Sequence, residues 1–216
     1  LAQGVKMANK DLTVIASGGD GDGYAIGMGH TIHALRRNMN MTYIVMDNQI
    51  YGLTKGQTSP SSAKGFVTKS TPKGNIEKNV APLELALSSG ATFVAQGFSS
   101  DIKALTKMIE DAIHHDGFSF VNVFSPCVTY NKVNTYDWFK EHLTSIDDIE
   151  GYDITDKQLA MKTVLDHESL VKGIVYQDTT TPSYESQISE LEHEALAKRD
   201  IHITEETFND LTAQFL

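Results

Sequence analysis

The stretch from Gly19 to Gly23 alternates three glycines with two aspartates, a pattern that few local structures accommodate. It follows an apolar run, residues 12–16, that predicts a strand, and it precedes a helical pattern over residues 26–37. Glycine tolerates a tight turn and keeps Cβ atoms away, so a ligand can approach the backbone closely. The helix N-terminus that follows offers free N–H groups and a positive dipole end. A diphosphate group fits this description.

Two carboxylates, Asp20 and Asp22, would repel a bound phosphate unless a cation lay between them. The simplest interpretation is a Mg²⁺ ion held by protein oxygens and diphosphate oxygens. A second predicted strand, residues 42–47, leads to Asn48, and 26 residues separate Gly21 from this asparagine. Parallel strands of a strand–helix–strand unit end at the same edge of the sheet, so Asp20 and Asn48 should meet at one site. For Asp22, capping of the following helix is an equally good interpretation.

This spacing of Gly-Asp-Gly and asparagine resembles the signature of thiamine diphosphate enzymes. The runs GDGDGYAIGMGHTIHALRRN, TYIVMDNQIYGLTKGQTSPSS and FSPCVTYN are similar, more specifically, to the β subunits of 2-oxoacid:ferredoxin oxidoreductases, above all the 2-oxoglutarate members. The resemblance is strongest over residues 1–131. It implies a thiamine diphosphate-binding fold and an enzyme that oxidatively decarboxylates 2-oxoglutarate with coenzyme A, giving succinyl-CoA and reduced ferredoxin.

The resemblance also implies roles for individual residues. The main-chain carbonyl of Ile50 would be a third Mg²⁺ ligand beside Asp20 and Asn48. The main-chain N–H of Leu53 and the hydroxyl of Thr54 could bind phosphate oxygens. Lys55 is either an ordinary solvated lysine or the cation that holds a substrate carboxylate. The predicted cofactor-binding residues are Gly19, Asp20, Gly21, Asp22, Asn48, Ile50, Leu53 and Thr54.

Cys127 is the one cysteine of the chain, and it follows a predicted buried strand. Such a cysteine is usually an inert core residue. In the family that the sequence resembles, a cysteine in this motif is the last ligand of a 4Fe–4S cluster, whose other three cysteines precede the thiamine motif. A cluster needs four thiolates, so we expect one only in a full-length subunit with an N-terminal region that this sequence lacks.

The expected partner is an α subunit that holds the pyrimidine ring and supplies the activating glutamate, in an α2β2 heterotetramer that uses ferredoxin. No catalytic side chain is assigned to this chain, so it should be inactive alone. Three alternatives stay open: a pyruvate or broad 2-oxoacid:ferredoxin oxidoreductase, another thiamine diphosphate-dependent decarboxylase, and a non-catalytic nucleotide-binding module. His30 and His33 could form a metal pair, but a structural role is the simpler interpretation.

Composition narrows the class of protein. The 216 residues are 40% hydrophobic and carry a formal net charge of −10, which argues against nucleic-acid binding. No apolar run reaches the ~18 residues of a membrane span. The single cysteine excludes an internal disulfide framework and favours a reducing, cytoplasmic compartment. We expect a thiamine diphosphate and magnesium domain over residues 1–135, followed by an acidic helical extension, 136–216, that packs on the domain or on a partner subunit.

The pattern predicts an α/β fold with a doubly wound, mostly parallel sheet. The near-continuous apolar character of residues 12–17 predicts a strand that is covered on both faces. Residues 50–80 show no periodicity and should form a functional loop. The remaining predicted strands are 42–47, 92–96, 118–124 and 171–176, and the predicted helices are 26–38, 82–89, 101–115, 136–143, 157–167, 184–199 and 205–215.

Overall fold

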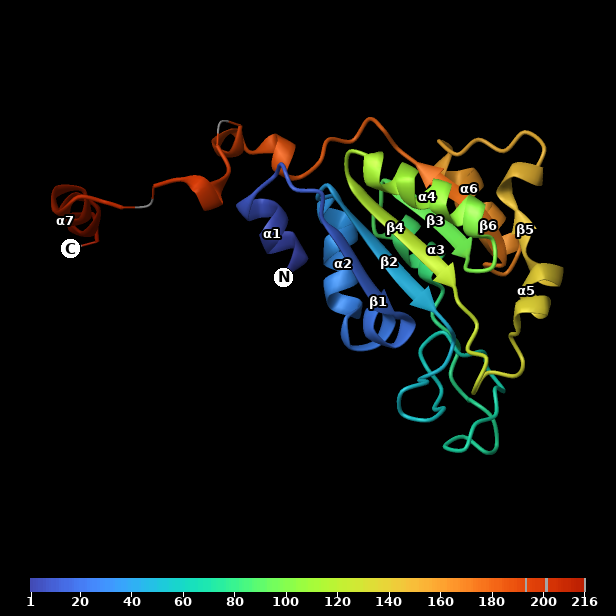
Figure 1. The fold of residues 1–216 in the computed structure, drawn as a ribbon. Coiled ribbons are helices and arrows are strands. Elements are labelled where there is room, and N and C mark those ends of the chain that lie inside the picture. The colour runs from blue at the N-terminus through green and yellow to red at the C-terminus, as the bar shows by residue number, and fades with distance from the viewer. Residues whose placement is uncertain (193, 201, 216) are drawn as a thin grey trace.

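The computed structural model describes residues 1–216 except 193, 201 and 216, and its centre is a six-stranded sheet (Figure 1). The strands lie in the order β1-β2-β4-β3-β6-β5. β1 to β4 are parallel, and β6 is antiparallel to β3, so the expected mostly parallel α/β sheet is confirmed. The strands are β1 (Ile15–Gly19), β2 (Met41–Asp47), β3 (Phe93–Phe98), β4 (Phe118–Phe124), β5 (Thr144–Ser145) and β6 (Val171–Gln177).

Helices cover both faces of the sheet. Phe118 and Phe120 of β4 belong to the core on the side of α2, α3 and α6. Val121 and Val123 alternate to the opposite face, where they pack with Met108 of α4. The α-helices are α1 (Ala2–Ala8), α2 (Met28–Arg37), α3 (Pro82–Ser88), α4 (Ile102–His114), α5 (Tyr136–His142), α6 (Lys157–Asp166) and α7 (Glu205–Ala213).

The first strand departs from its prediction. It begins at Ile15 rather than at residue 12, and it continues through Gly18 and Gly19, which pair with Val45 and Met46 of β2. β1 is an edge strand, and Ile15 is 50% exposed, so the prediction that this strand is covered on both faces is wrong. The apolar run therefore indicated a strand correctly but not its degree of burial.

A π-helical turn, η1 (Asp22–Ile26), precedes α2, so the predicted helix over residues 26–38 has an irregular start. The N–H of Gly27 donates to the carbonyl of Asp22 at 2.7 Å, across five residues. A Cβ atom on Gly27 would lie 2.5 Å from that same oxygen, so this turn requires glycine. Such π turns often occur at functional sites.

The long connection between β2 and α3 is a loop, as predicted for residues 50–80. Backbone hydrogen bonds between Gly65 and Asn75 and between Asn75 and Phe66 fold part of it into a compact projection. The loop starts at the carboxyl end of β2, and Figure 1 shows it extending below that edge of the sheet.

The chain after residue 180 contains a second departure. The predicted helix over residues 184–199 is wrong, because three short 3-10 turns, η3 (Glu185–Gln187), η4 (Ser189–Leu191) and η5 (Leu196–Lys198), take its place. Glu185 is buried, accepts a hydrogen bond from the N–H of Asn40 at 3.1 Å, and lies 3.8 Å from the Lys6 ammonium group. These tertiary contacts outweigh local helix propensity.

Part of the chain after residue 135 belongs to the sheet or packs against its helices. β6 belongs to the sheet, and α6 packs against α3, whereas α7 lies apart from the sheet in Figure 1. A further short turn, η2 (Ile146–Asp148), follows β5. A domain boundary near residue 135 stays a prediction. Among the described residues, we find no helix with the length and apolar character needed to cross a membrane.

Candidate functional site

The predicted site residues lie at the carboxyl ends of β1 and β2. Gly19, the last residue of β1, is in register with Met46 of β2. Asp20 follows Gly19 directly, and Asp47 follows Met46 as the last residue of β2. The topology that the sequence predicted thus holds, and it brings a carboxylate from each segment to one edge of the sheet. Asn48 follows Asp47 directly.

The carboxylate of Asp20 is buried, with 3% of the residue exposed. Its Oδ2 atom accepts hydrogen bonds from the hydroxyls of Ser59 at 2.5 Å and Ser61 at 2.6 Å. Both serines belong to the long loop, which returns to the strand end some forty positions after Asp20. A buried carboxylate at the start of a glycine-rich turn is suited to bind a hard cation such as Mg²⁺.

Asp47, which was not among the predicted site residues, is a second buried carboxylate beside Asp20. Its Oδ1 atom lies 2.7 Å from Ser61 Oγ, whose one proton is shared between the two carboxylates, and the N–H of Gln49 donates to the same oxygen at 3.2 Å. Burial, followed by the negative charge of Asp20, raises the pKa of Asp47 to about 7. The two carboxylates therefore act on each other through Ser61.

A buried polar network supports Asp47 from inside the sheet. The hydroxyl of Tyr24 donates to Asn122 Oδ1 at 2.6 Å, and Asn122 Nδ2 donates to Gln96 Oε1 at 2.8 Å. Burial, and then the negative charge of Asp47, raises the pKa of Tyr24 well above its ordinary value. Tyr24 thus stays a hydrogen-bond donor, which fixes the polar side chains beneath the strand ends.

Asn48 forms a tight turn at the strand end. Its Oδ1 atom accepts a hydrogen bond from the N–H of Ile50 at 3.0 Å, and Asn131 Nδ2 lies 3.4 Å from its main-chain oxygen. The side chain of Ile50 is buried. An amide oxygen has two lone pairs, so Asn48 Oδ1 retains one that can bind a metal.

The turn from Tyr51 to Gln57 contains the predicted phosphate and substrate residues. Its ends form an isolated β-bridge, and Leu53 at its tip is 99% exposed. Lys55 is also exposed and has a φ of 71°, a left-handed conformation that is uncommon outside glycine. Thr54 lies within hydrogen-bond distance of Gln57 through their side-chain oxygens.

This turn packs directly on the glycine-rich stretch. The hydroxyl of Tyr51 donates to the carbonyl of Gly21 at 3.4 Å. A Cβ atom on Gly21 would lie 2.1 Å from Cε1 of the Tyr51 ring, so the close approach of the two segments depends on glycine. The Asp20–Gly21 turn and the 51–57 turn therefore form one structural unit.

Asp22 has surroundings different from those of Asp20. It is the first residue of the π turn, and the N-cap position belongs to Gly21, so the N-capping interpretation of Asp22 is wrong. Its Oδ2 atom lies beside Gly18, where a Cβ atom on that glycine would be 2.7 Å from Asp22 Oδ2 and 3.0 Å from the Tyr43 hydroxyl. Burial, and then the charge of Asp22, raises the pKa of Tyr43. A role of Asp22 in cofactor binding stays a prediction.

Cys127 lies beside the start of the same turn, because a Cβ atom on Gly52 would be 3.9 Å from its sulfur. Burial raises the pKa of the thiol, but hydrogen bonds from backbone N–H groups, led by that of Tyr130, and the charge of Lys132 outweigh burial, so the pKa lies below its ordinary value. A thiol with a lowered pKa is more readily a thiolate, the form that binds metals.

The histidines of α2 are exposed and make only local contacts. His33 Nδ1 accepts a hydrogen bond from Arg36 Nε at 3.0 Å. Over the part of the chain that the structure describes, no group of three or more His, Cys, Asp or Glu side chains is arranged to bind a metal.

Comparisons with known proteins agree with this geometry. Residues 1–123 match the family described as thiamine pyrophosphate enzyme, C-terminal TPP binding domain. Residues 127–193 match the C-terminal family of the pyruvate ferredoxin oxidoreductase β subunit. A solved 2-oxoglutarate:ferredoxin oxidoreductase from Magnetococcus marinus superposes with a TM-score of 0.86 at 36% identity, covering 97% of this chain and 71% of that one. The chain belongs to the 2-oxoacid:ferredoxin oxidoreductase β subunits.

Curated relatives support the assignment of the β subunit. The 2-oxoacid:ferredoxin oxidoreductase subunit beta of a Sulfolobus species is 42% identical over 197 residues, 87% of this chain and 65% of the relative. The 2-oxoglutarate oxidoreductase subunit KorB of Mycobacterium tuberculosis is 46% identical over 131 residues, 61% of this chain and 35% of the relative. The chain thus spans about two thirds or less of the length of these relatives.

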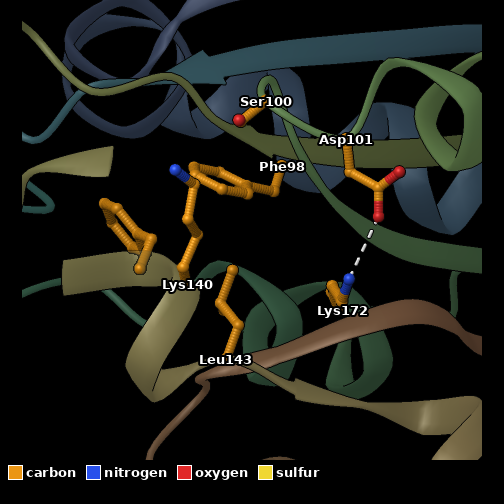
Figure 2. Close-up of a pocket in the computed structure, with 7 residues that line it drawn as sticks. Phe98, Ser100, Asp101, Lys140, Leu143 and Lys172 are labelled. Atoms are coloured by element: carbon orange, nitrogen blue, oxygen red, sulfur yellow. Dashed lines mark hydrogen bonds and ion pairs between the residues drawn. The ribbon is translucent and has the colours of Figure 1, made fainter. Parts of the chain in front are cut away.

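The β subunit also has a hollow that the sequence did not predict. This cavity has a volume of about 240 Å³, and Figure 2 shows residues that line it, among them Phe98 of β3 and Lys140 of α5. An ion pair of 3.0 Å between Asp101 and Lys172 borders it, and the hydrogen bond from Lys172 lowers the pKa of Asp101. None of the predicted site residues lines this hollow, which is bordered by Phe98, Ser100, Asp101, Phe139, Lys140, Leu143 and Lys172.

Proposed function

We propose that this β subunit binds thiamine diphosphate through a Mg²⁺ ion held by Asp20, Asn48 and the main-chain oxygen of Ile50. The observation that carries the proposal is the buried Asp20 carboxylate at the end of β1. Two serine hydroxyls hold its Oδ2 atom, and, within the described residues, no hydrogen bond reaches Oδ1. Oδ1 is therefore the oxygen of this carboxylate that would bind the cation.

The diphosphate would lie against the glycine-rich stretch. Gly19 and Gly21 present backbone without side chains, and the main-chain N–H of Leu53 and the hydroxyl of Thr54 would bind its phosphate oxygens. Asp22 is the last of the proposed cofactor-binding residues and would lie near the diphosphate. Packing of the Tyr51 ring on Gly21 supports this arrangement, since it holds the 51–57 turn against the strand end.

The whole enzyme would convert 2-oxoglutarate, coenzyme A and oxidised ferredoxin to succinyl-CoA, CO₂ and reduced ferredoxin. Bound thiamine diphosphate supplies the electron sink for loss of CO₂. The residues of this chain bind and orient that cofactor, and a glutamate that activates it would come from an α subunit in an α2β2 assembly in the cytoplasm. In the full-length subunit, Cys127 would be one of four thiolates that hold a 4Fe–4S cluster.

Lys55 would hold a carboxylate of the substrate. Its left-handed backbone conformation in an exposed turn is the kind of outlier that functional sites contain. A 2-oxoacid brings one carboxylate next to the keto group, and a dicarboxylic substrate brings a second. Removing one partner of a desolvated charge pair typically costs about 2–5 kcal/mol. Lys55→Ala should therefore lower kcat/KM for 2-oxoglutarate by at least ~30-fold, the low end of that range.

Ferredoxin reduction by the complete enzyme tests the proposal. Purified complex with coenzyme A should reduce ferredoxin with 2-oxoglutarate, and pyruvate should be the poorer substrate. Lys64→Ala, an exposed lysine of the same loop, is the matched control and should leave the rate unchanged. Equal rates with both substrates would favour a broad 2-oxoacid enzyme. No ferredoxin reduction with any 2-oxoacid, or unaltered kinetics of Lys55→Ala, would contradict the corresponding part of the proposal.

A further inference from the structure

Two serines of the long loop, Ser59 and Ser61, contact the predicted metal ligand Asp20, and neither was among the predicted site residues. We propose that Ser59 and Ser61 are positioning residues that orient the Asp20 carboxylate toward the metal and couple the order of their loop to metal occupancy. The inference deepens the proposed function and rests on it, because Asp20 must bind the ion for its orientation to matter.

The contacts to Asp20 are one-sided. Both hydroxyls donate to Oδ2, Ser59 at 2.5 Å and Ser61 at 2.6 Å. Each serine is at most 6% exposed, so these bonds are shielded from water and cannot be replaced readily by solvent. With Oδ2 occupied by two donors, Oδ1 is the oxygen of Asp20 that remains available to a cation. The serines therefore fix both the rotation of the carboxylate and the oxygen that it presents.

Ser61 also fixes the distance between the two strand ends. Its Oγ atom lies 2.6 Å from Asp20 Oδ2 and 2.7 Å from Asp47 Oδ1, so one side chain bridges the residues that follow β1 and end β2. Asp47 adjoins Asn48, the second predicted ligand. A shift of Ser61 would therefore displace both predicted metal ligands relative to each other.

The turn that carries the serines is held by its own hydrogen bonds. The N–H of Ser59 donates to Ser62 Oγ at 2.9 Å, and the Ser62 hydroxyl donates to the carbonyl of Gln49 at 2.6 Å. The N–H of Val80 donates to the carbonyl of Pro60 at 2.9 Å. The serines are thus pre-positioned, and binding at Asp20 should in turn stabilise residues 59–62, because coupling between two sites is reciprocal.

Manganese provides a readout that does not depend on activity. Binding of Mn²⁺ to the complete enzyme in the presence of thiamine diphosphate is followed by electron paramagnetic resonance of the free ion. Loss of a side chain that orients a metal ligand typically weakens metal affinity by about 10- to 100-fold. We expect Ser61→Ala and Ser59→Ala to raise the Mn²⁺ dissociation constant by that factor. Ser61→Thr, which keeps the hydroxyl, should bind nearly as the wild type does.

Ser70→Ala is the matched control, because Ser70 is an exposed serine of the same loop whose hydroxyl contacts Thr68 and, among the described contacts, makes no hydrogen bond to Asp20. Its Mn²⁺ affinity should stay within about threefold of wild type. Hydrogen exchange of residues 59–62 should slow on addition of Mn²⁺ and thiamine diphosphate in the wild type but not in Ser61→Ala. Wild-type affinity in both alanine variants, or an equal loss in Ser70→Ala, would overturn the inference. Failure of the wild type itself to bind would instead overturn the proposed function.

Discussion

Replacement of Gly21 by alanine tests whether the glycine-rich turn and the 51–57 turn form one unit. The backbone of Gly21 has φ −65° and ψ −30°, which alanine adopts without strain. The new Cβ atom, however, would lie 2.1 Å from Cε1, 2.8 Å from Cδ1 and 2.9 Å from Cζ of Tyr51, well inside the ~3.5–4.0 Å of normal carbon contacts. The ring must move, and its hydrogen bond to the Gly21 carbonyl is lost.

Forced overpacking of this kind typically costs about 1–3 kcal/mol. For a chain of this size, 1 kcal/mol lowers the melting temperature by about 2–4 °C. We therefore expect Gly21→Ala to melt about 2–12 °C below the wild type in calorimetry of the purified enzyme. In a Tyr51→Ala background the obstacle is absent, so the same substitution should cost less than about 0.5 kcal/mol. An equal cost of Gly21→Ala in both backgrounds would refute the steric argument.

Three further predictions concern other parts of the molecule. Burial lowers the pKa of His115, so the imidazole binds a proton less readily in the folded chain than in the unfolded chain, and the free energy of unfolding should fall as pH is lowered below ~6.5. In urea titrations at several pH values, His115→Gln should lose this dependence of the unfolding free energy on pH, and an unchanged dependence would contradict the assignment to His115. Cys127→Ser in the full-length enzyme should reduce the visible absorbance of a 4Fe–4S cluster, whereas the 216-residue chain should show none, and stoichiometric iron in that chain would contradict our ligand count. The Asp101–Lys172 pair is partly exposed, so Lys172→Ala should cost no more than ~1 kcal/mol, and a larger loss in denaturation would indicate a role in the adjoining hollow.

Much of the fold was predictable because apolar strands alternate with amphipathic helices. The strand over residues 118–124 was predicted with the bounds that the structure has, since both faces are buried and turn residues flank it. The first strand was placed too early because glycine is unfavourable inside a strand, yet Gly18 and Gly19 pair with β2. The helix predicted over residues 184–199 does not form, because contacts of Glu185 with distant residues decide its conformation.

The site was predictable only where local motif and topology determine it. Asp20 and Asn48 follow strands that end at the same sheet edge, so their proximity follows from the chain order. Ser59 and Ser61 reach Asp20 through an irregular loop whose path has no periodicity to read. Asp47 could have been predicted as a site residue, since a carboxylate that ends an otherwise apolar strand needs a polar partner when it is buried.

Calorimetric titration of the complete enzyme, freed of cofactor, with thiamine diphosphate in the presence and absence of Mg²⁺ measures whether Asp20 anchors the cofactor through the metal. The wild type should bind only with Mg²⁺, and Asp20→Ala should not bind under either condition, because no other carboxylate has the position of Asp20 at the end of β1. Asp137→Ala, at an exposed site on α5, serves as the control and should bind as the wild type does. Normal Mg²⁺-dependent binding by Asp20→Ala would contradict the central claim.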